Sequence, residues 1–450
     1  MLPQLRKIER RYADTVQVVS VHSPKFPTER ETENLRQAVL RLRIEHPVLN
    51  DADFAYWQTF GARAWPTLYF IDPSGNVIGL HEGELTEDMV APLIDGWLEE
   101  YDQESLLTRR GLGLVRETGR ESALSFPGKV AWDDTAGRLV ISDSNNDRVL
   151  VADIDGHVSL VVGGSEAGFA DGSATEARFN QPQGVAIDGD AIYVADNENH
   201  AIRRIDLPSG EVSTIAGVGE QARQMPSGRP ATATALSSPW DVAVYDDDLF
   251  IAMAGIHQIW RMPLNGQQGE GSYVGPWGGS GREGIEDGPR MQAELAQVSG
   301  LAPGPSGLAF ADSESSGVRE VSWDPDGRVR TFIGKNGQGG LFHFGDADGG
   351  RAVARLQHPL DVARVGDDLY VADTFNHKIK QVFPQTEQVT TLVGGHGASL
   401  GGFDDVQLDE PGGLTNGPGH SLLVADTNNH RIVQLDLETR QGREITLKLP

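Results

Sequence analysis

A short pattern that recurs along most of the chain constrains the fold more than any other feature. Two apolar or small residues precede an aspartate, and an asparagine followed by His or Asp comes three residues later, before Ile or Val. The aspartate position falls at Asp143, Asp196, Met253, Asp312, Asp373 and Asp426, with methionine replacing the aspartate once. Successive positions are between 53 and 61 residues apart. A period of this size predicts six structural repeats.

Each repeat contains four short strand-like segments separated by turn residues. In the second repeat they cover 182–186, 192–196, 202–206 and 212–217. Four strands per repeat are typical of a propeller blade, and the 54 glycines of the chain suit the many tight turns. The sequence therefore predicts a mainly β fold, with a six-bladed β-propeller over residues 123–450.

The repeats resemble the NHL family, which takes its name from an Asn-His pair. That pair stands here at Asn199-His200, Asn376-His377 and Asn429-His430. The resemblance implies an NHL-type six-bladed propeller. Aspartate and asparagine side chains can bond to nearby backbone N–H groups, so we interpret the recurring aspartates as turn-stabilising residues. The turn histidines fit the same interpretation, with ligand binding as the alternative.

A second recurring segment joins the blades and points to a binding face. It contains 168–172, 284–288 and 345–349, and each copy is followed by an apolar residue that we expect to pack between blades, namely Phe179, Leu295 and Leu356. In a four-stranded up-and-down blade these connectors emerge on the same face as the turns between the second and third strands, so we expect the inserts and the Asn-His turns to share one face. Loops on a rigid scaffold carry function, so we place any binding site on that face. The candidate binding residues on that face are Trp240, Phe169, Arg178, Arg355, His358, His200, His377 and His430.

Residues 1–104 show a different hydrophobic pattern. It predicts the order helix, strand, helix, helix, strand, strand, helix, with a buried strand over 16–21. This order, with Trp65-Pro66-Thr67 opening a strand, resembles a thioredoxin fold, in which the matching proline is cis. The resemblance implies that Pro66, with Trp65, is the cis-proline. The first strand and the Cys-x-x-Cys pair of that fold are absent from this chain, so we expect an incomplete, N-terminally truncated thioredoxin-like domain. A basic, glycine-rich linker over 105–122 follows it.

Composition excludes several classes of function. The 450 residues include no cysteine, so they contain neither a thiolate metal site nor a catalytic thiol. The net charge of −27 makes nucleic acid a poor partner. No apolar stretch is long enough to span a membrane, and the first residues lack an apolar signal core, so we expect a cytoplasmic protein.

The sequence carries one weak indication of a metal ion. Asp241 and Asp361 replace a small residue at the entry of two inner strands, near the propeller axis. Carboxylates suit Ca²⁺, but two of them do not specify a site, so we predict no cofactor.

Three functions remain open. The first is a non-catalytic binding module, in which the propeller presents its loop-rich face to a protein or small ligand and the redox-inactive thioredoxin-like domain serves for docking. The alternative is a thiol–disulfide oxidoreductase-like protein whose Cys-x-x-Cys segment is missing from this chain. A weaker alternative is a hydrolase or lyase acting at the propeller channel.

Overall fold

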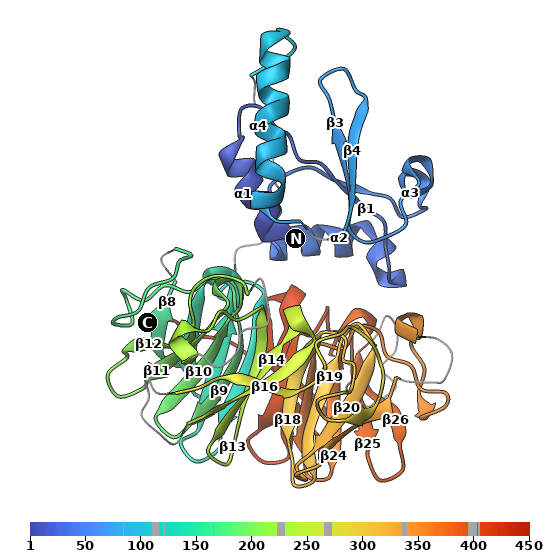
Figure 1. The fold of residues 1–450 in the computed structure, drawn as a ribbon. Helices are drawn as coiled ribbons and strands as arrows, with labels where there is room; N and C mark the ends of the chain where they lie inside the picture. Colours follow the sequence, from blue (N-terminus) through green and yellow to red (C-terminus); the bar gives the residue numbers. More distant parts are fainter. Residues whose placement is uncertain are drawn as a thin grey trace. The chain divides into compact units, whose positions relative to one another are not determined.

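The chain forms two compact units, Met1–Glu121 and Ser122–Pro450 (Figure 1). A computed structural model describes residues 1–83, 85–109, 117–119, 122–164, 166–222, 230–264, 272–334, 340–394, 403 and 406–450. Residues 110–116, 120 and 121 of the predicted linker lie outside these ranges. Within them, no helix combines the length and the apolar character that crossing a membrane would require.

The N-terminal unit is a small α/β structure. Its elements are α1 (Leu2–Arg11), β1 (Ser20–His22), α2 (Thr32–Arg41), β2 (Val48–Asn50), α3 (Ala55–Phe60), β3 (Thr67–Ile71), β4 (Val77–Glu82) and α4 (Glu87–Gln103). Strands β1 and β2 pair in parallel, and β3 and β4 form an antiparallel hairpin. Helix α1 and the residue after it, Tyr12, pack against helix α4; Ile8, Tyr12, Val90 and Ile94 are buried in the core of the unit.

Two details of this unit differ from the expectation. The strand predicted over 16–21 covers Ser20–His22 alone. Among the described residues it forms a two-stranded sheet with β2, and its Val21 side chain is 44% exposed rather than buried. Strand β2 was not predicted, since its three residues are too few to show an alternating pattern.

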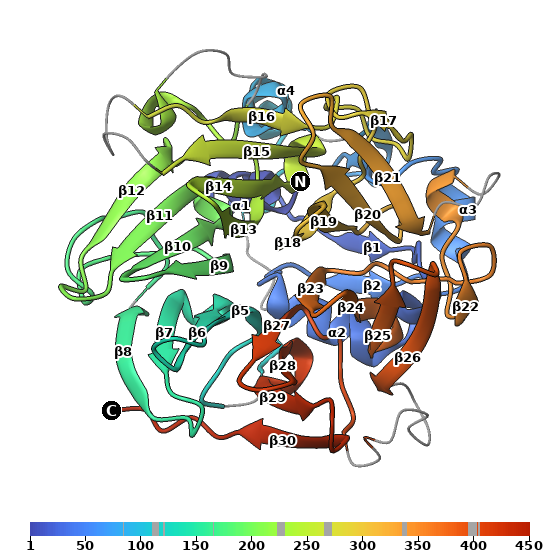
Figure 2. The same cartoon turned by 90° about the horizontal axis from the view of Figure 1, so that it is seen from below.

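The second unit is a six-bladed β-propeller, as predicted (Figure 2). Each blade contains four consecutive antiparallel strands, and two of the six sheets gain a short fifth strand at the outer edge. Blade 1 contains β5 (Pro127–Asp133), β6 (Arg138–Asp143), β7 (Arg148–Ala152) and β8 (Val158–Gly163), and blade 2 contains β9 (Pro182–Asp188), β10 (Ala191–Asp196), β11 (Ala201–Asp206) and β12 (Val212–Gly217). Blade 3 contains β13 (Pro239–Tyr245), β14 (Asp248–Met253), β15 (Gln258–Pro263) and β16 (Gly275–Gly278).

The remaining blades follow the same plan. Blade 4 contains β18 (Val298–Pro303), β19 (Gly307–Asp312), β20 (Gly317–Ser322) and β21 (Arg328–Ile333), and blade 5 contains β23 (Asp361–Val365), β24 (Asp368–Asp373), β25 (Lys378–Phe383) and β26 (Gln388–Gly394). Blade 6 contains β27 (Gly413–Gly417), β28 (Ser421–Asp426), β29 (Arg431–Asp436) and β30 (Gln441–Ile445). The first strand of every blade is innermost, so its free edge faces the axis (Figure 2).

The hydrophobic core lies between neighbouring blades. Six clusters of buried apolar residues each combine side chains from two adjacent blades. The inserts contribute to these clusters, as expected: Phe179, Leu295 and Leu356 are fully buried. Burial on both faces explains why the blade strands are nearly continuous runs of β-branched and small apolar residues.

The inserts begin and end at the face of the Asn-His turns, but they also cover the rim. Gly172 pairs with Val212 of β12, and the short strands β17 (Gly288–Pro289) and β22 (Gly349–Gly350) pair with β21 and β26. Each insert therefore protects the outer edge of the blade that follows it. An unpaired strand edge invites association with other chains, so this pairing removes a hazard.

The ring closes between blades 6 and 1, and in the part of the chain that the structure describes no strand is shared between these two blades. The backbone N–H of Phe126 donates to His430 Nδ1 at 3.0 Å, and the Thr427 hydroxyl donates to the Pro127 carbonyl at 2.9 Å. The C-terminal residues then cross to the outer edge of blade 1, where the backbone of Lys448 exchanges hydrogen bonds with Gly156 and Val158. The seam is thus held at its inner strand and at its rim.

Candidate functional site

The inner strands of the propeller carry a charged cluster at the axis. One position of each inner strand, the residue before the first core Val or Leu, alternates between a charged side chain and glycine. Blades 1, 3 and 5 have Lys129, Asp241 and Asp361, and blades 2, 4 and 6 have Gly184, Gly300 and Gly413. We call Lys129, Asp241 and Asp361 the axial triad.

The alternation with glycine has a steric cause. A Cβ on Gly184 would lie 2.4 Å from Asp241 Cα, and a Cβ on Gly300 would lie 2.4 Å from Asp361 Oδ1. A Cβ on Gly413 would lie 2.7 Å from Lys129 Cα. At this position two neighbouring inner strands lie too close together for both of them to carry a side chain. Each triad side chain therefore lies next to a glycine on the neighbouring inner strand.

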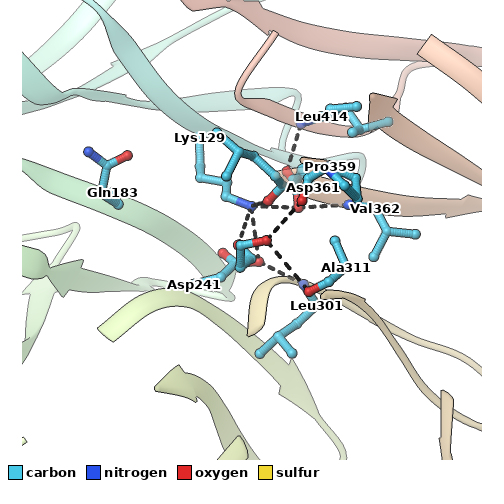
Figure 3. A network of polar contacts seen from close by, with 12 residues as sticks. Lys129, Gln183, Asp241, Leu301, Ala311, Pro359, Asp361, Val362 and Leu414 are labelled. Carbon is cyan, nitrogen blue, oxygen red and sulfur yellow. Dashed lines mark hydrogen bonds and ion pairs between the residues drawn. The ribbon is translucent and has the colours of Figure 1, made fainter. Parts of the chain in front are cut away.

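The Lys129 ammonium lies among oxygen atoms of three other blades (Figure 3). Its Nζ is 2.6 Å from Asp361 Oδ1 and 3.6 Å from Asp241 Oδ2. It also donates hydrogen bonds to the carbonyls of Ser299, at 2.8 Å, and Leu360, at 2.9 Å. All three triad side chains are at least 92% buried. The structure thus brings the two metal candidates Asp241 and Asp361 together, but the cation between them is the ammonium of Lys129.

The triad also satisfies backbone groups of the inner strands. Asp241 Oδ2 accepts a hydrogen bond from the Leu301 N–H at 2.8 Å, and Asp361 Oδ2 accepts one from the Leu414 N–H at 2.7 Å. Each aspartate therefore links its own blade to the next one around the ring. An inner strand has no partner on its axial side, and buried N–H and C=O groups left without a partner are costly. The two aspartates of the triad accept hydrogen bonds from the axial edges of the inner strands, and Lys129 donates hydrogen bonds to carbonyls there.

Two carboxylates facing one ammonium make this site electrostatically unbalanced. Burial, together with the nearby Asp241 carboxylate, raises the pKa of Asp361 to about 7, against the opposing effect of the Lys129 ammonium. Burial also raises the pKa of Asp241. When two interacting acids share a site, their protons belong to the pair rather than to either residue. The triad is therefore expected to hold an extra proton at and below neutral pH.

The repeated aspartates hold the turns of their own blades. Each accepts a hydrogen bond at 2.6–2.9 Å from a backbone N–H just before the inner strand of the same blade; they are Asp143, Asp196, Asp312, Asp373 and Asp426. Each also pairs with a cation on the third strand, for example Asp196 with Arg203 at 2.8 Å. These groups are engaged inside the fold and not directed at a ligand.

The turn histidines join neighbouring blades. His200 Nδ1 accepts a hydrogen bond at 3.0 Å from the N–H of Ser238, and His377 Nδ1 accepts one at 3.1 Å from the N–H of Glu410, both at the entry of the next blade. His430 acts likewise across the seam. His200 and His377 are buried, which argues against them as contacts for a partner.

Four of the other predicted binding residues lie on two blade connections, and Trp240 lies in the inner strand β13. Phe169 is 42% exposed, and the Arg203 guanidinium lies 5.1 Å from its ring centroid. Arg178 and Arg355 fold back and donate to backbone carbonyls of their own inserts. Trp240 is half-buried beside Asp241, and the half-buried His358 stacks on the Phe375 ring with centroids 4.5 Å apart. These five residues therefore do not form one patch.

In the N-terminal unit, the peptide bond between Trp65 and Pro66 is cis. The Trp65 indole N–H donates to the Ser23 carbonyl at 2.8 Å. The ring centroids of Trp65 and Trp57 are 4.3 Å apart.

Sequence reasoning missed Lys129. A signal was available, since Pro127-Gly128-Lys129-Val130-Ala131 aligns with Pro239-Trp240-Asp241-Val242-Ala243. The alignment places the lysine at the aspartate position of blades 3 and 5. Among the residues that the structure describes, no group of three or more His, Cys, Asp or Glu side chains is arranged to hold a metal ion.

Comparison with known proteins agrees with the propeller geometry. The NHL repeat model matches residues 179–205. The chain is 42% identical over 470 residues to NHL repeat-containing protein 2 of Bos taurus and 40% identical to that of Homo sapiens; each alignment covers 98% of this chain and 65% of the relative. It is 39% identical to Protein SUPPRESSOR OF QUENCHING 1, chloroplastic, of Arabidopsis thaliana, over 100% of this chain and 44% of that protein. The chain, which spans less than two thirds of these relatives' length, is therefore a relative of NHL repeat-containing protein 2 and carries an NHL-repeat propeller.

Proposed function

We propose that the chain is a non-catalytic binding scaffold. The propeller would present its blade-connecting loops to a protein or small ligand, and the N-terminal unit would act as a thioredoxin-like docking domain without redox chemistry. The similarity to NHL-repeat propellers supports a binding role. The 450 residues include no cysteine for thiol chemistry, and the axial carboxylates are bound to Lys129 and to backbone N–H groups, which lends no support to a hydrolase or lyase at the axis.

The distribution of exposed apolar side chains carries this proposal. In the described part of the propeller, the large apolar residues that remain exposed lie mainly in blade connections: Phe169, Val218, Met291, Phe342 and Val353, each 41–63% exposed. The other two are Tyr273, which forms a β-bridge with Pro230 just before β16, and Leu449 in the C-terminal tail. Loops on a rigid scaffold that keep apolar side chains in solvent are typical binding elements.

A capture experiment with matched variants tests this assignment. The immobilised full chain would be compared with a double variant, Phe169→Ser with Val353→Ser, and with Leu449→Ser as a control of similar exposure. Bound partners would be fixed by cross-linking. We expect the double variant to lose partners that the wild type and the control retain, although the unfolding midpoint of the double variant is unchanged. Identical partners for all three chains would contradict the proposed surface.

A further inference from the structure

The position of the Lys129 ammonium has the features of a metal site. Four oxygens surround it: one from each carboxylate of Asp241 and Asp361, and the carbonyls of Ser299 and Leu360, at 2.6–3.6 Å from Nζ. They come from blades 3, 4 and 5, and they converge on one buried point (Figure 3). A cation is already seated there, as part of the chain itself.

We infer that the axis of this propeller is an oxygen-lined cation site in which Lys129 supplies the cation, and that the same site binds Ca²⁺ when the lysine side chain is removed. This inference concerns how the ring is held together and does not depend on the proposed binding role of the loops.

Charge favours a divalent ion. Truncating Lys129 would leave two carboxylates buried side by side without a counter-ion, which is strongly unfavourable. One Ca²⁺ would restore neutrality, whereas a monovalent ion would leave one negative charge. Backbone groups hold both carboxylates in place independently of the lysine, since Leu301 and Leu414 donate to them. The oxygens would therefore stay close to one another after the truncation.

The donor set selects among divalent ions. All four donors are oxygens, which suit Ca²⁺ and Mg²⁺ better than Zn²⁺. Truncating Lys129 to alanine removes the three carbons beyond Cβ and the ammonium nitrogen, which leaves room for an ion with bound water. Ca²⁺ takes six to eight oxygens in flexible geometry at about 2.3–2.6 Å, so water can complete its shell, whereas Mg²⁺ demands a near-ideal octahedron at about 2.0–2.1 Å. The observed spread of distances fits the more tolerant ion.

The test uses the full chain at pH 7.5, as wild type, Lys129→Ala, and the double variant Lys129→Ala with Asp361→Asn. Thermal unfolding is followed in EDTA and with increasing CaCl₂, and bound calcium is measured by equilibrium dialysis. We expect Lys129→Ala to unfold several degrees below wild type in EDTA and to regain about 5 °C in saturating Ca²⁺. Dialysis should show one Ca²⁺ more per chain for Lys129→Ala than for wild type. The double variant should respond to Ca²⁺ no more than wild type does.

If Lys129→Ala does not fold in EDTA, refolding from urea with and without CaCl₂ decides the question. Recovery of the propeller only in Ca²⁺ supports the inference, and failure in both conditions overturns it. A folded Lys129→Ala chain that neither binds the extra Ca²⁺ nor gains stability also overturns it. An equal response to Ca²⁺ in the double variant would place the ion elsewhere and has the same consequence.

Discussion

Replacing Asp361 with asparagine removes one of the two buried carboxylates that share the Lys129 ammonium. Asparagine keeps the shape of the side chain and retains one oxygen that can accept from the Leu414 N–H. The ammonium keeps the Asp241 carboxylate, 3.6 Å away, as its partner. The substitution therefore removes the unbalanced negative charge and leaves the link to blade 6 in place.

The expected effect is a change in how stability depends on pH. The pKa of Asp361 is raised to about 7 by burial, whereas an aspartate in an unfolded chain has a pKa of about 4. Between these values the unfolded chain releases the proton and the folded chain retains it. The contribution of this proton is therefore complete below about pH 4 and is lost as the pH rises through about 7. Each pH unit in that window lowers the free energy of unfolding by up to about 1.4 kcal/mol, or roughly 4 kcal/mol in all.

Urea unfolding at pH 5 and pH 7, followed by tryptophan fluorescence, measures this contribution. Between these conditions the wild type should lose about 2–3 kcal/mol more than Asp361→Asn, because the variant lacks the shared acid. Asp188→Asn, at the exposed end of the inner strand of blade 2, is the control and should behave as wild type. If wild type and Asp361→Asn lose the same free energy, the buried carboxylate pair does not share a proton as we describe.

Other substitutions test the remaining parts of the ring. His200→Ala should cost about 1–3 kcal/mol of unfolding free energy, because it leaves a backbone N–H of blade 3 without its acceptor; an unchanged urea midpoint would refute the role of this histidine in joining blades. Gly300→Ala should destabilise by several kcal/mol or prevent folding, since its Cβ would overlap a buried carboxylate, whereas Gly275→Ala, with no atom within 4 Å of the new Cβ, should be close to neutral in the same assay. Arg203→Met should cost about 3–5 kcal/mol by leaving Asp196 buried without its cation, and a loss below 1 kcal/mol would contradict this pairing.

The sequence predicts the propeller well because the same turn pattern occurs in every blade. Six copies of a turn pattern at a near-constant period define six blades, even where Met253 replaces the aspartate. Short elements without a repeat are harder, and strand β2 in the N-terminal unit is an example.

The axial triad could be predicted only in part. Asp241 and Asp361 stand out because a carboxylate replaces a glycine of the repeat, and Lys129 could have been found by extending the alignment to the first blade. Their contact could not be read from the sequence, because it joins residues 112 and 232 positions apart through ring closure. The histidine contacts were missed for a similar reason. His200 and His377 each accept from a residue 38 or 33 positions later, in the next blade, and His430 accepts from a residue at the other end of the propeller.

Because the four main strands of every blade are consecutive and the two ends of the propeller meet at one seam, the ring itself does not fix which blade comes first along the chain. A circularly permuted propeller, with residue 450 linked to residue 122 and new termini opened in an exposed insert, would contain the same blades and the same contacts between them. Such permutants should close into the same ring, and comparing their folding rates would show whether the ring assembles from any blade or only from the blade that is made first.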